Sequence, residues 1–163
     1  MRKALVVGIG NELRGDDAVG LVLLSKLKAR AGVELLEAGT VPEAYTGIMT
    51  GAGADLILLI DAADFGGQPG EVALFDHLTA PDRLYTAHNA PLGLLMQYLK
   101  NECDAEVLLL GIQPKDARID ASMTPEVEKT TETLAGLLNA DLVGTIEALR
   151  QPKPAAEGNL GVG

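Results

Sequence analysis

The chain has 163 residues, 47% of them hydrophobic but only 3% aromatic, and its formal net charge is −10 at pH 7. That length suits one domain with a full core, built mainly from Leu, Val, Ile and Ala. Strong negative charge argues against nucleic acid or an anionic membrane as partner, whereas a cationic segment or a metal ion suits it. The single cysteine, Cys103, excludes an internal disulfide.

Domain limits and cellular location follow from the distribution of apolar residues. No stretch approaches the ~20 apolar residues of a membrane helix. The apolar run near the N-terminus ends by Asn11, too early for a signal peptide, so we expect a cytoplasmic protein. From Gln151 the chain is polar and rich in Pro and Gly. The sequence therefore predicts one domain over residues 1–150 and a flexible tail over 151–163.

The chain opens with a strand, a glycine turn and a helix, which together form the first unit of a parallel α/β sheet. The strand is expected at about 3–9 and the helix at 18–30, with Asp16 or Asp17 as its N-cap. The turn between them lies at the carboxyl end of the strand, where such sheets bind their ligands.

The remaining pattern predicts four more strands and three more helices. The strands are expected at 33–38, 55–62, 71–75 and 106–112. The helices are expected at 42–50, 90–101 and 125–149. Asn89 is the expected cap of the second of these helices and Pro91 lies in its first turn, while Gly136 and Gly144 are expected to bend the third. The most apolar strand, 55–62, is predicted to be central. Only about eight residues separate it from 71–75, too few for a parallel crossover, so that strand should be antiparallel. The result is an α/β fold with a mostly parallel five-stranded sheet.

A dinucleotide site is the first interpretation of such a glycine turn, and it fails in detail. Gly8 and Gly10 fit the Gly-x-Gly-x-x-Gly fingerprint, but Leu13 stands at the third glycine position. Asp16 and Asp17 also lie where a pyrophosphate needs positive potential. The acidic pair instead indicates a cation.

Three places along the chain are expected to meet at one edge of the sheet. Asp16 and Asp17 follow the first strand, Asp61 ends the central strand, and His88 precedes a helix. Two carboxylates and an imidazole suit a divalent first-row metal. Each residue also has an ordinary interpretation as a helix cap, a turn residue or a surface group. His77 has no such setting and receives no role.

Several short motifs, in this order, resemble the nickel-iron hydrogenase maturation endopeptidases, above all the branch that serves hydrogenase 3 of the formate-hydrogenlyase type. They are Gly8-Ile9-Gly10-Asn11, Gly15-Asp16-Asp17-Ala18-Val19-Gly20, Asp61-Ala62 followed by Pro69-Gly70-Glu71, His88-Asn89-Ala90-Pro91-Leu92, and Leu110-Gly111-Ile112-Gln113-Pro114. The resemblance covers about residues 3–149. One departure is Glu37-Ala38-Gly39, where the family usually has Asp-Gly-Gly.

The resemblance implies a three-layer sandwich, with helices on both faces of a twisted sheet, and a specific activity. Members of this family make a single cut near the C-terminus of the hydrogenase large-subunit precursor, after a basic residue, once nickel has been inserted. The family's metal ligands, which are also the catalytic residues we expect, fall on Asp17, Asp61 and His88. Nickel would then be supplied by the substrate rather than held by the free enzyme, which we expect to be a monomer.

Two other classes of function remain open at this point. A non-enzymatic nickel carrier or sensor would use the same three ligands without a peptide groove. A nucleotide-binding α/β protein is disfavoured by the acidic turn. No His-Glu-x-x-His, Gly-x-Ser-x-Gly or cysteine pair supports a zinc protease, a serine hydrolase or a zinc ribbon.

Overall fold

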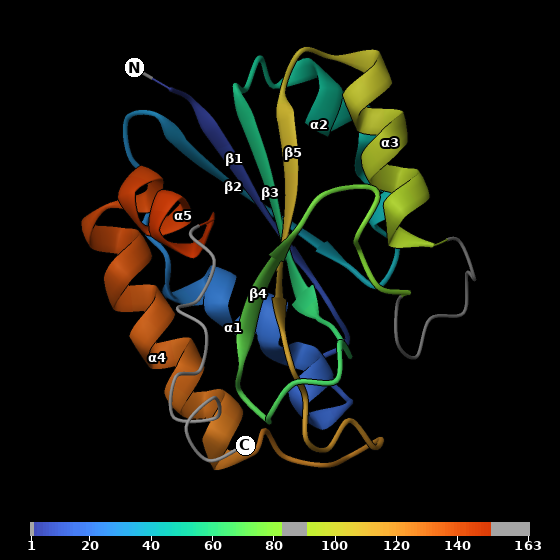
Figure 1. The fold of residues 1–163 in the computed structure, drawn as a ribbon, viewed down its shortest axis with the longest axis vertical. Helices are drawn as coiled ribbons and strands as arrows, with labels where there is room; N and C mark the ends of the chain where they lie inside the picture. Colours follow the sequence, from blue (N-terminus) through green and yellow to red (C-terminus); the bar gives the residue numbers. More distant parts are fainter. Residues whose placement is uncertain (1, 83–90, 151–163) are drawn as a thin grey trace, which may run out of the picture.

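The structure, a computed structural model, describes residues 2–82 and 91–150. Within these residues one five-stranded sheet has the order β2-β1-β3-β5-β4 (Figure 1). The strands are β1 Ala4–Ile9, β2 Val33–Gly39, β3 Leu56–Ala62, β4 Val72–Phe75 and β5 Glu106–Ile112. The helices are α1 Val19–Lys26, α2 Thr46–Gly51, α3 Leu92–Glu102, α4 Pro125–Ala140 and α5 Leu142–Arg150, with 3-10 turns η1 Gly15–Ala18 and η2 Pro42–Tyr45.

The strand directions agree with the sequence prediction. β1 pairs in parallel with both β2 and β3, and β3 pairs in parallel with β5. β4 is the edge strand and runs antiparallel to β5. Every residue of β3 is buried, as expected for the central strand of an α/β sheet. The expectation of a mostly parallel sheet with one antiparallel strand is confirmed.

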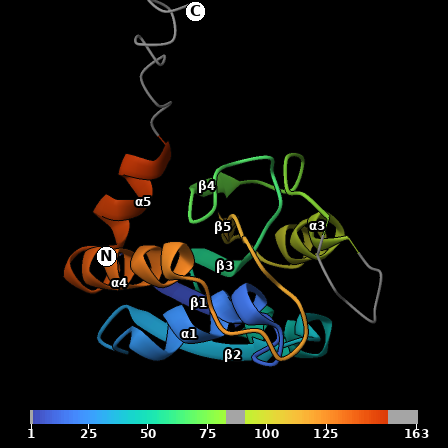
Figure 2. The same ribbon diagram turned by 90° about the horizontal axis from the view of Figure 1, so that it is seen from below.

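Alternate residues of the strands point to opposite faces, and each face has its own helices (Figures 1 and 2). On one face Val6, Leu58 and Leu110 pack with apolar residues of α1, α4 and α5. On the other face Val7 and Leu59, with their neighbours along the sheet, pack with α2 and α3. The molecule is therefore the expected three-layer sandwich, with its core divided between two sides of one sheet.

The first helix ends four residues earlier than predicted, at Lys26 rather than Arg30. Leu27 adopts an extended conformation, and Asn139 of α4 takes over the bonds that a longer helix would make. The Lys28 N–H donates to the Asn139 side-chain oxygen over 2.9 Å, and the Asn139 amide donates to the Lys26 carbonyl over 2.9 Å. A side chain distant in sequence thus terminates α1, so the local helical pattern overestimated its length.

The long C-terminal helix is divided into α4 and α5 at Asp141, not merely bent. The Asp141 carboxylate accepts the Gly144 N–H over 2.9 Å, which is the hydrogen bond of a helix N-cap. A Cβ on Gly144 would overlap that carboxylate. Gly144 therefore permits the break, whereas Gly136 has open space around it and takes no part.

Other predicted ends can be compared only in part. Pro91 is the N-cap residue of α3 rather than a first-turn residue, and Asn89, its predicted cap, lies outside the described residues. The predicted tail, 151–163, also lies outside them. Cys103 follows α3 as expected, with its thiol donating to the Leu99 carbonyl. Across the described part of the chain, no helix combines the length and the apolar character needed to cross a bilayer.

Candidate functional site

The turn after β1 is shaped by close backbone contacts that require glycine. A Cβ on Gly10, whose φ is +149°, would overlap the backbone oxygen of Asp17. A Cβ on Gly20 would overlap the carbonyl oxygens of Ile9 and Ile60. The second contact means that α1 begins directly over the ends of both β1 and β3. Glycine at these two positions therefore brings η1, which carries the acidic pair, to the carboxyl edge of the sheet.

Asp17 lies on η1 and is 4% exposed. Its Oδ2 accepts the Asn11 N–H over 3.2 Å, and its backbone oxygen lies at the same distance from that nitrogen. Its own N–H donates to the Arg14 carbonyl over 2.9 Å. The glycine turn and Asp17 thus hold each other in place, with the carboxylate beside the end of β1.

Asp16 is fully buried and faces a different partner, the loop between β5 and α4. Its Oδ2 accepts the N–H groups of Lys115 (2.8 Å) and Asp116 (3.0 Å). Oδ2 also accepts the Thr124 hydroxyl (2.8 Å), and Oδ1 accepts the Thr124 N–H (2.7 Å). Neither Asp16 nor Asp17 is the N-cap of α1, which is Ala18 with no side-chain cap bond, so that expectation is wrong. Asp16 instead ties the first turn to the far loop.

Asp61 is the second-last residue of β3 and is 4% exposed. Its Oδ1 accepts the N–H of the next residue, Ala62, over 2.8 Å. On the neighbouring strand it lies opposite Gly111 of β5. Because Gly20 contacts the carbonyl of Ile60, the start of α1 and the end of β3 meet at the same edge. Asp17 and Asp61 are therefore both buried carboxylates at the carboxyl edge, as the sequence predicts.

The third predicted ligand, His88, lies outside the described residues. Among residues 2–82 and 91–150, no three His, Cys, Asp or Glu side chains form a cluster that could hold a metal ion. His77, which received no role, is half-buried in the segment after β4. The described chain thus provides two of the three proposed ligands.

 The turn after β2, which departs from the family pattern, borders a cavity of about 250 Å³. It is lined by Gly10, Asn11, Glu12, Leu13, Leu21, Glu37, Gly39 and Thr40. Gly39 keeps the positive φ of +61° that glycine favours, and Ala38 is buried. The remaining glycine therefore stands where the backbone needs one, and Glu37 borders the cavity.

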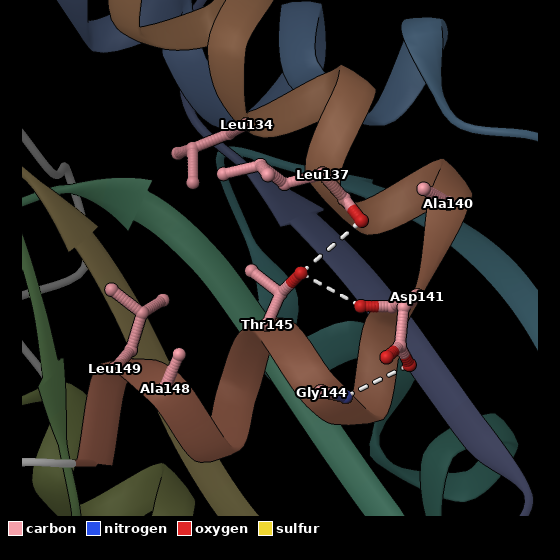
Figure 3. A pocket seen from close by; sticks show the side chains of 8 residues that line it. All are labelled: Leu134, Leu137, Ala140, Asp141, Gly144, Thr145, Ala148 and Leu149. Atoms are coloured by element: carbon pink, nitrogen blue, oxygen red, sulfur yellow. Dashed lines mark hydrogen bonds between the residues drawn. The ribbon is translucent and has the colours of Figure 1, made fainter.

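A larger groove, of about 390 Å³, lies at the opposite edge of the sheet, between α4 and α5 (Figure 3). Its lining is mostly apolar, with the Thr145 hydroxyl donating to the carbonyls of Leu137 (3.1 Å) and Asp141 (2.7 Å). The end of α5 is tied by Arg150 to Glu106 at the start of β5. The groove is thus separated from the two carboxylates by the length of the strands, and it forms no part of the site.

The fold and the buried carboxylates define the structural class of the protein, which is a three-layer α/β protein with an acidic site at the carboxyl ends of its parallel strands. The family model described as "Hydrogenase maturation protease" matches residues 21–140. The chain belongs to the hydrogenase maturation protease family, and it is a peptidase.

Individual relatives agree with this assignment. A putative hydrogenase maturation protease of Methanocaldococcus jannaschii is 38% identical over 124 residues, covering 70% of this chain and 73% of the relative. The hydrogenase 3 maturation protease of Escherichia coli K12 is 32% identical over 133 residues, covering 77% and 82%. The crystal structure of a NiFe hydrogenase maturation protease from Thermococcus kodakarensis superposes with a TM-score of 0.75 at 29% identity, covering 92% and 94%. The resemblance seen in the motifs is confirmed.

Sequence reasoning did not identify the partners that hold the acidic turn. Thr124 is the N-cap residue of α4, yet its hydroxyl donates to Asp16 and makes no cap bond to the helix. Gln113, noted only as part of a motif, is a buried polar residue that follows β5. Both contacts join segments about 50 to 100 residues apart, and no local pattern signals such contacts.

Proposed function

We propose that this protein removes the C-terminal extension of a hydrogenase large-subunit precursor and recognises the nickel that the precursor carries. The observation that supports the proposal most is the burial of Asp17 and Asp61 at the edge where α/β sheets bind ligands. His88 completes the proposed ligand set. The family assignment supports the hydrogenase precursor as substrate.

The chemistry of this donor set favours nickel that arrives with the substrate. Two carboxylates and one imidazole bind a free divalent ion more weakly than a site completed by thiolates. A cysteine cluster in the precursor would supply such thiolates, whereas the one cysteine of this chain, Cys103, lies at the end of α3. The free enzyme is therefore expected to hold little tightly bound metal.

Binding through the metal also explains how the two carboxylates act on a peptide bond. It fixes the precursor beside Asp17 and Asp61, so that proximity supplies part of the catalysis. A positioned carboxylate can also accept a proton from the attacking water, and general base catalysis contributes roughly 10²–10⁴-fold. These roles make Asp17, Asp61 and His88 the proposed catalytic residues as well as the proposed ligands.

The direct test is to incubate the protein with candidate precursors, each with and without nickel, and to measure their masses. We expect loss of a C-terminal peptide only from the nickel-loaded form. A nickel carrier or sensor would leave the precursor's length unchanged, and that outcome would replace the present proposal. Asp61→Ala and His88→Ala are expected to abolish cleavage while the domain stays folded.

Treatment with a chelator distinguishes an enzyme that uses nickel carried by the substrate from one that holds a metal ion of its own. A strong chelator added to the enzyme alone and then removed should leave activity intact. If that treatment destroys activity and zinc restores it, the protein holds its own ion and is an ordinary metalloprotease.

We also propose that the enzyme acts in the cytoplasm as a monomer. Size-exclusion chromatography with light scattering can check the oligomeric state.

A further inference from the structure

Gln113 follows β5 directly and is only 7% exposed. Its side-chain carboxamide uses both of its polar atoms on the loop that leaves β3. Oε1 accepts the N–H groups of Phe65 (2.9 Å) and Gly67 (3.0 Å). Nε2 donates to Oδ1 of Asp64 over 3.1 Å. One buried side chain therefore fixes three successive parts of this loop.

The backbone of Gln113 fixes the far end of the same loop. Its N–H donates to the Glu71 carbonyl over 2.8 Å, and its carbonyl accepts the Gly70 N–H over 2.8 Å. The loop between β3 and β4 is thus held at both ends by a single residue. We refer to these contacts of Gln113 with residues 64–71 as the Gln113 clamp.

The clamp begins three residues after the proposed catalytic Asp61. Ala62 and Ala63, the two residues between them, are buried, and the Ala63 N–H donates to the Ile112 carbonyl over 3.0 Å. The pairing of Asp61 and Ala62 with β5 fixes the strand itself, and the clamp fixes the chain directly beyond it. The Asp61 carboxylate therefore lies at the junction between the strand and the clamped loop.

We propose that Gln113 is a positioning residue that holds the end of β3 so that the Asp61 carboxylate meets the substrate in a fixed geometry; this rests on the proposed function. The clamp needs an acceptor and a donor on one short planar group, which a carboxamide offers and a carboxylate does not. Residues that hydrogen-bond directly to metal ligands typically contribute about 10–100-fold to activity or metal affinity, and we take this range as the expected size of the effect of Gln113.

Gln113→Glu tests this role because the introduced carboxyl can be switched by pH. When ionised it still accepts from Phe65 and Gly67, but it cannot donate to Asp64, whose negative charge it faces. When protonated it can donate again. The ionisable side chains of this loop and of the strand it enters are Asp64 and Glu71.

We expect kcat of Gln113→Glu on nickel-loaded precursor to fall about 10–100-fold at pH 8, with KM changed less than about threefold. The ratio of its kcat to that of the parent should rise as the pH is lowered toward 5.5. Gln68→Glu is the matched control, because Gln68 is exposed on the same loop and gains the same charge. Its ratio to the parent should stay constant with pH.

A double variant separates positioning from general loss of stability. Asp64→Asn added to Gln113→Glu exchanges donor and acceptor across the contact. It should restore kcat at pH 8 to within about threefold of the parent and remove the pH dependence. A kcat ratio that does not vary with pH, or a double variant no better than Gln113→Glu, would overturn the proposal.

The side-chain carboxyl carbon of Asp61, followed by NMR, gives a readout that does not depend on cleavage. Its chemical shift should move in Gln113→Glu at pH 8, return toward the parent value on acidification, and stay unchanged in Gln68→Glu. If the parent cleaves no precursor, the proposed function fails, while this signal still decides whether Gln113 positions Asp61. An Asp61 signal that is identical in both variants excludes the positioning role.

Discussion

Replacing Asp16 by Asn is expected to destabilise the fold much more than it weakens nickel binding, and Asp17→Asn is expected to do the reverse. Asp16 accepts four hydrogen bonds from the loop that contains Lys115, Asp116 and Thr124. An asparagine has only one acceptor atom. If that oxygen takes the place of Oδ2, three bonds remain and the new NH₂ group faces the Thr124 N–H.

The loss of folding stability in Asp16→Asn follows from the one hydrogen bond that is lost, the bond from the Thr124 N–H. A hydrogen bond to a charged group contributes about 1.5–3 kcal/mol, and a donor left unpaired in the interior costs about 1–3 kcal/mol. Asp16→Asn should therefore lower the free energy of unfolding by about 2–4 kcal/mol. For a domain of this size that corresponds to a fall in Tm of about 5–15 °C. Thr124→Val removes one donor from the other side of the contact and should cost less.

Thermal unfolding followed by circular dichroism measures the change in stability, and calorimetric titration with nickel in the presence of precursor measures the change in nickel binding. Asp16→Asn should keep nickel affinity within a modest factor at a temperature where it is folded, whereas Asp17→Asn should lose most of it. The reasoning is refuted if Asp16→Asn keeps its Tm and loses nickel binding. It is also refuted if Asp17→Asn binds nickel as the parent does.

Three further outcomes are expected. Deleting residues 151–163 should leave Tm and cleavage nearly unchanged, and a drop of many degrees would contradict the absence of a packing pattern there. Gly20→Ala should cost about 1–3 kcal/mol or more because its Cβ would overlap two carbonyl oxygens, whereas Gly136→Ala in open space on α4 should stabilise by about 0.5–1 kcal/mol. Hydrogen bonds from Arg150 and Arg2 hold the pKa of Glu106 below its usual range. The stability that Glu106 contributes to the fold is therefore complete above the unfolded-state pKa of about 4.3, and it is lost as the pH falls through the lower folded-state pKa. Glu106→Gln should flatten the acid side of a curve of Tm against pH.

The sheet could be predicted from the sequence because its signals are local. Runs such as Leu56–Ala62 are apolar throughout, which identifies a strand buried on both faces. The short connection before Val72–Phe75 excluded a parallel crossover. Strand positions, the central strand and the antiparallel edge strand all follow from these features.

Helix ends could not be predicted so well, because two of them depend on partners that local patterns do not show. Asn139 of α4 ends α1, more than one hundred residues away in sequence. At Asp141, apolar periodicity continues through the break, so the pattern indicates one helix while the Asp141 carboxylate starts a second. Periodicity describes which face is buried, but tertiary hydrogen bonds decide where each helix stops.

The neighbouring carboxylates Asp16 and Asp17 have different partners, and the sequence alone does not distinguish their roles in the site. Successive residues of a 3-10 turn point about 120° apart, so the two side chains of η1 face different surroundings. An ionised carboxylate has about four acceptor positions, and Asp16 already accepts four hydrogen bonds from one loop. A metal at Asp16 would therefore compete with a carboxylate that already holds the loop through both of its oxygens. The physical case for Asp17 as the ligand is therefore that its neighbour is committed to holding the turn in place.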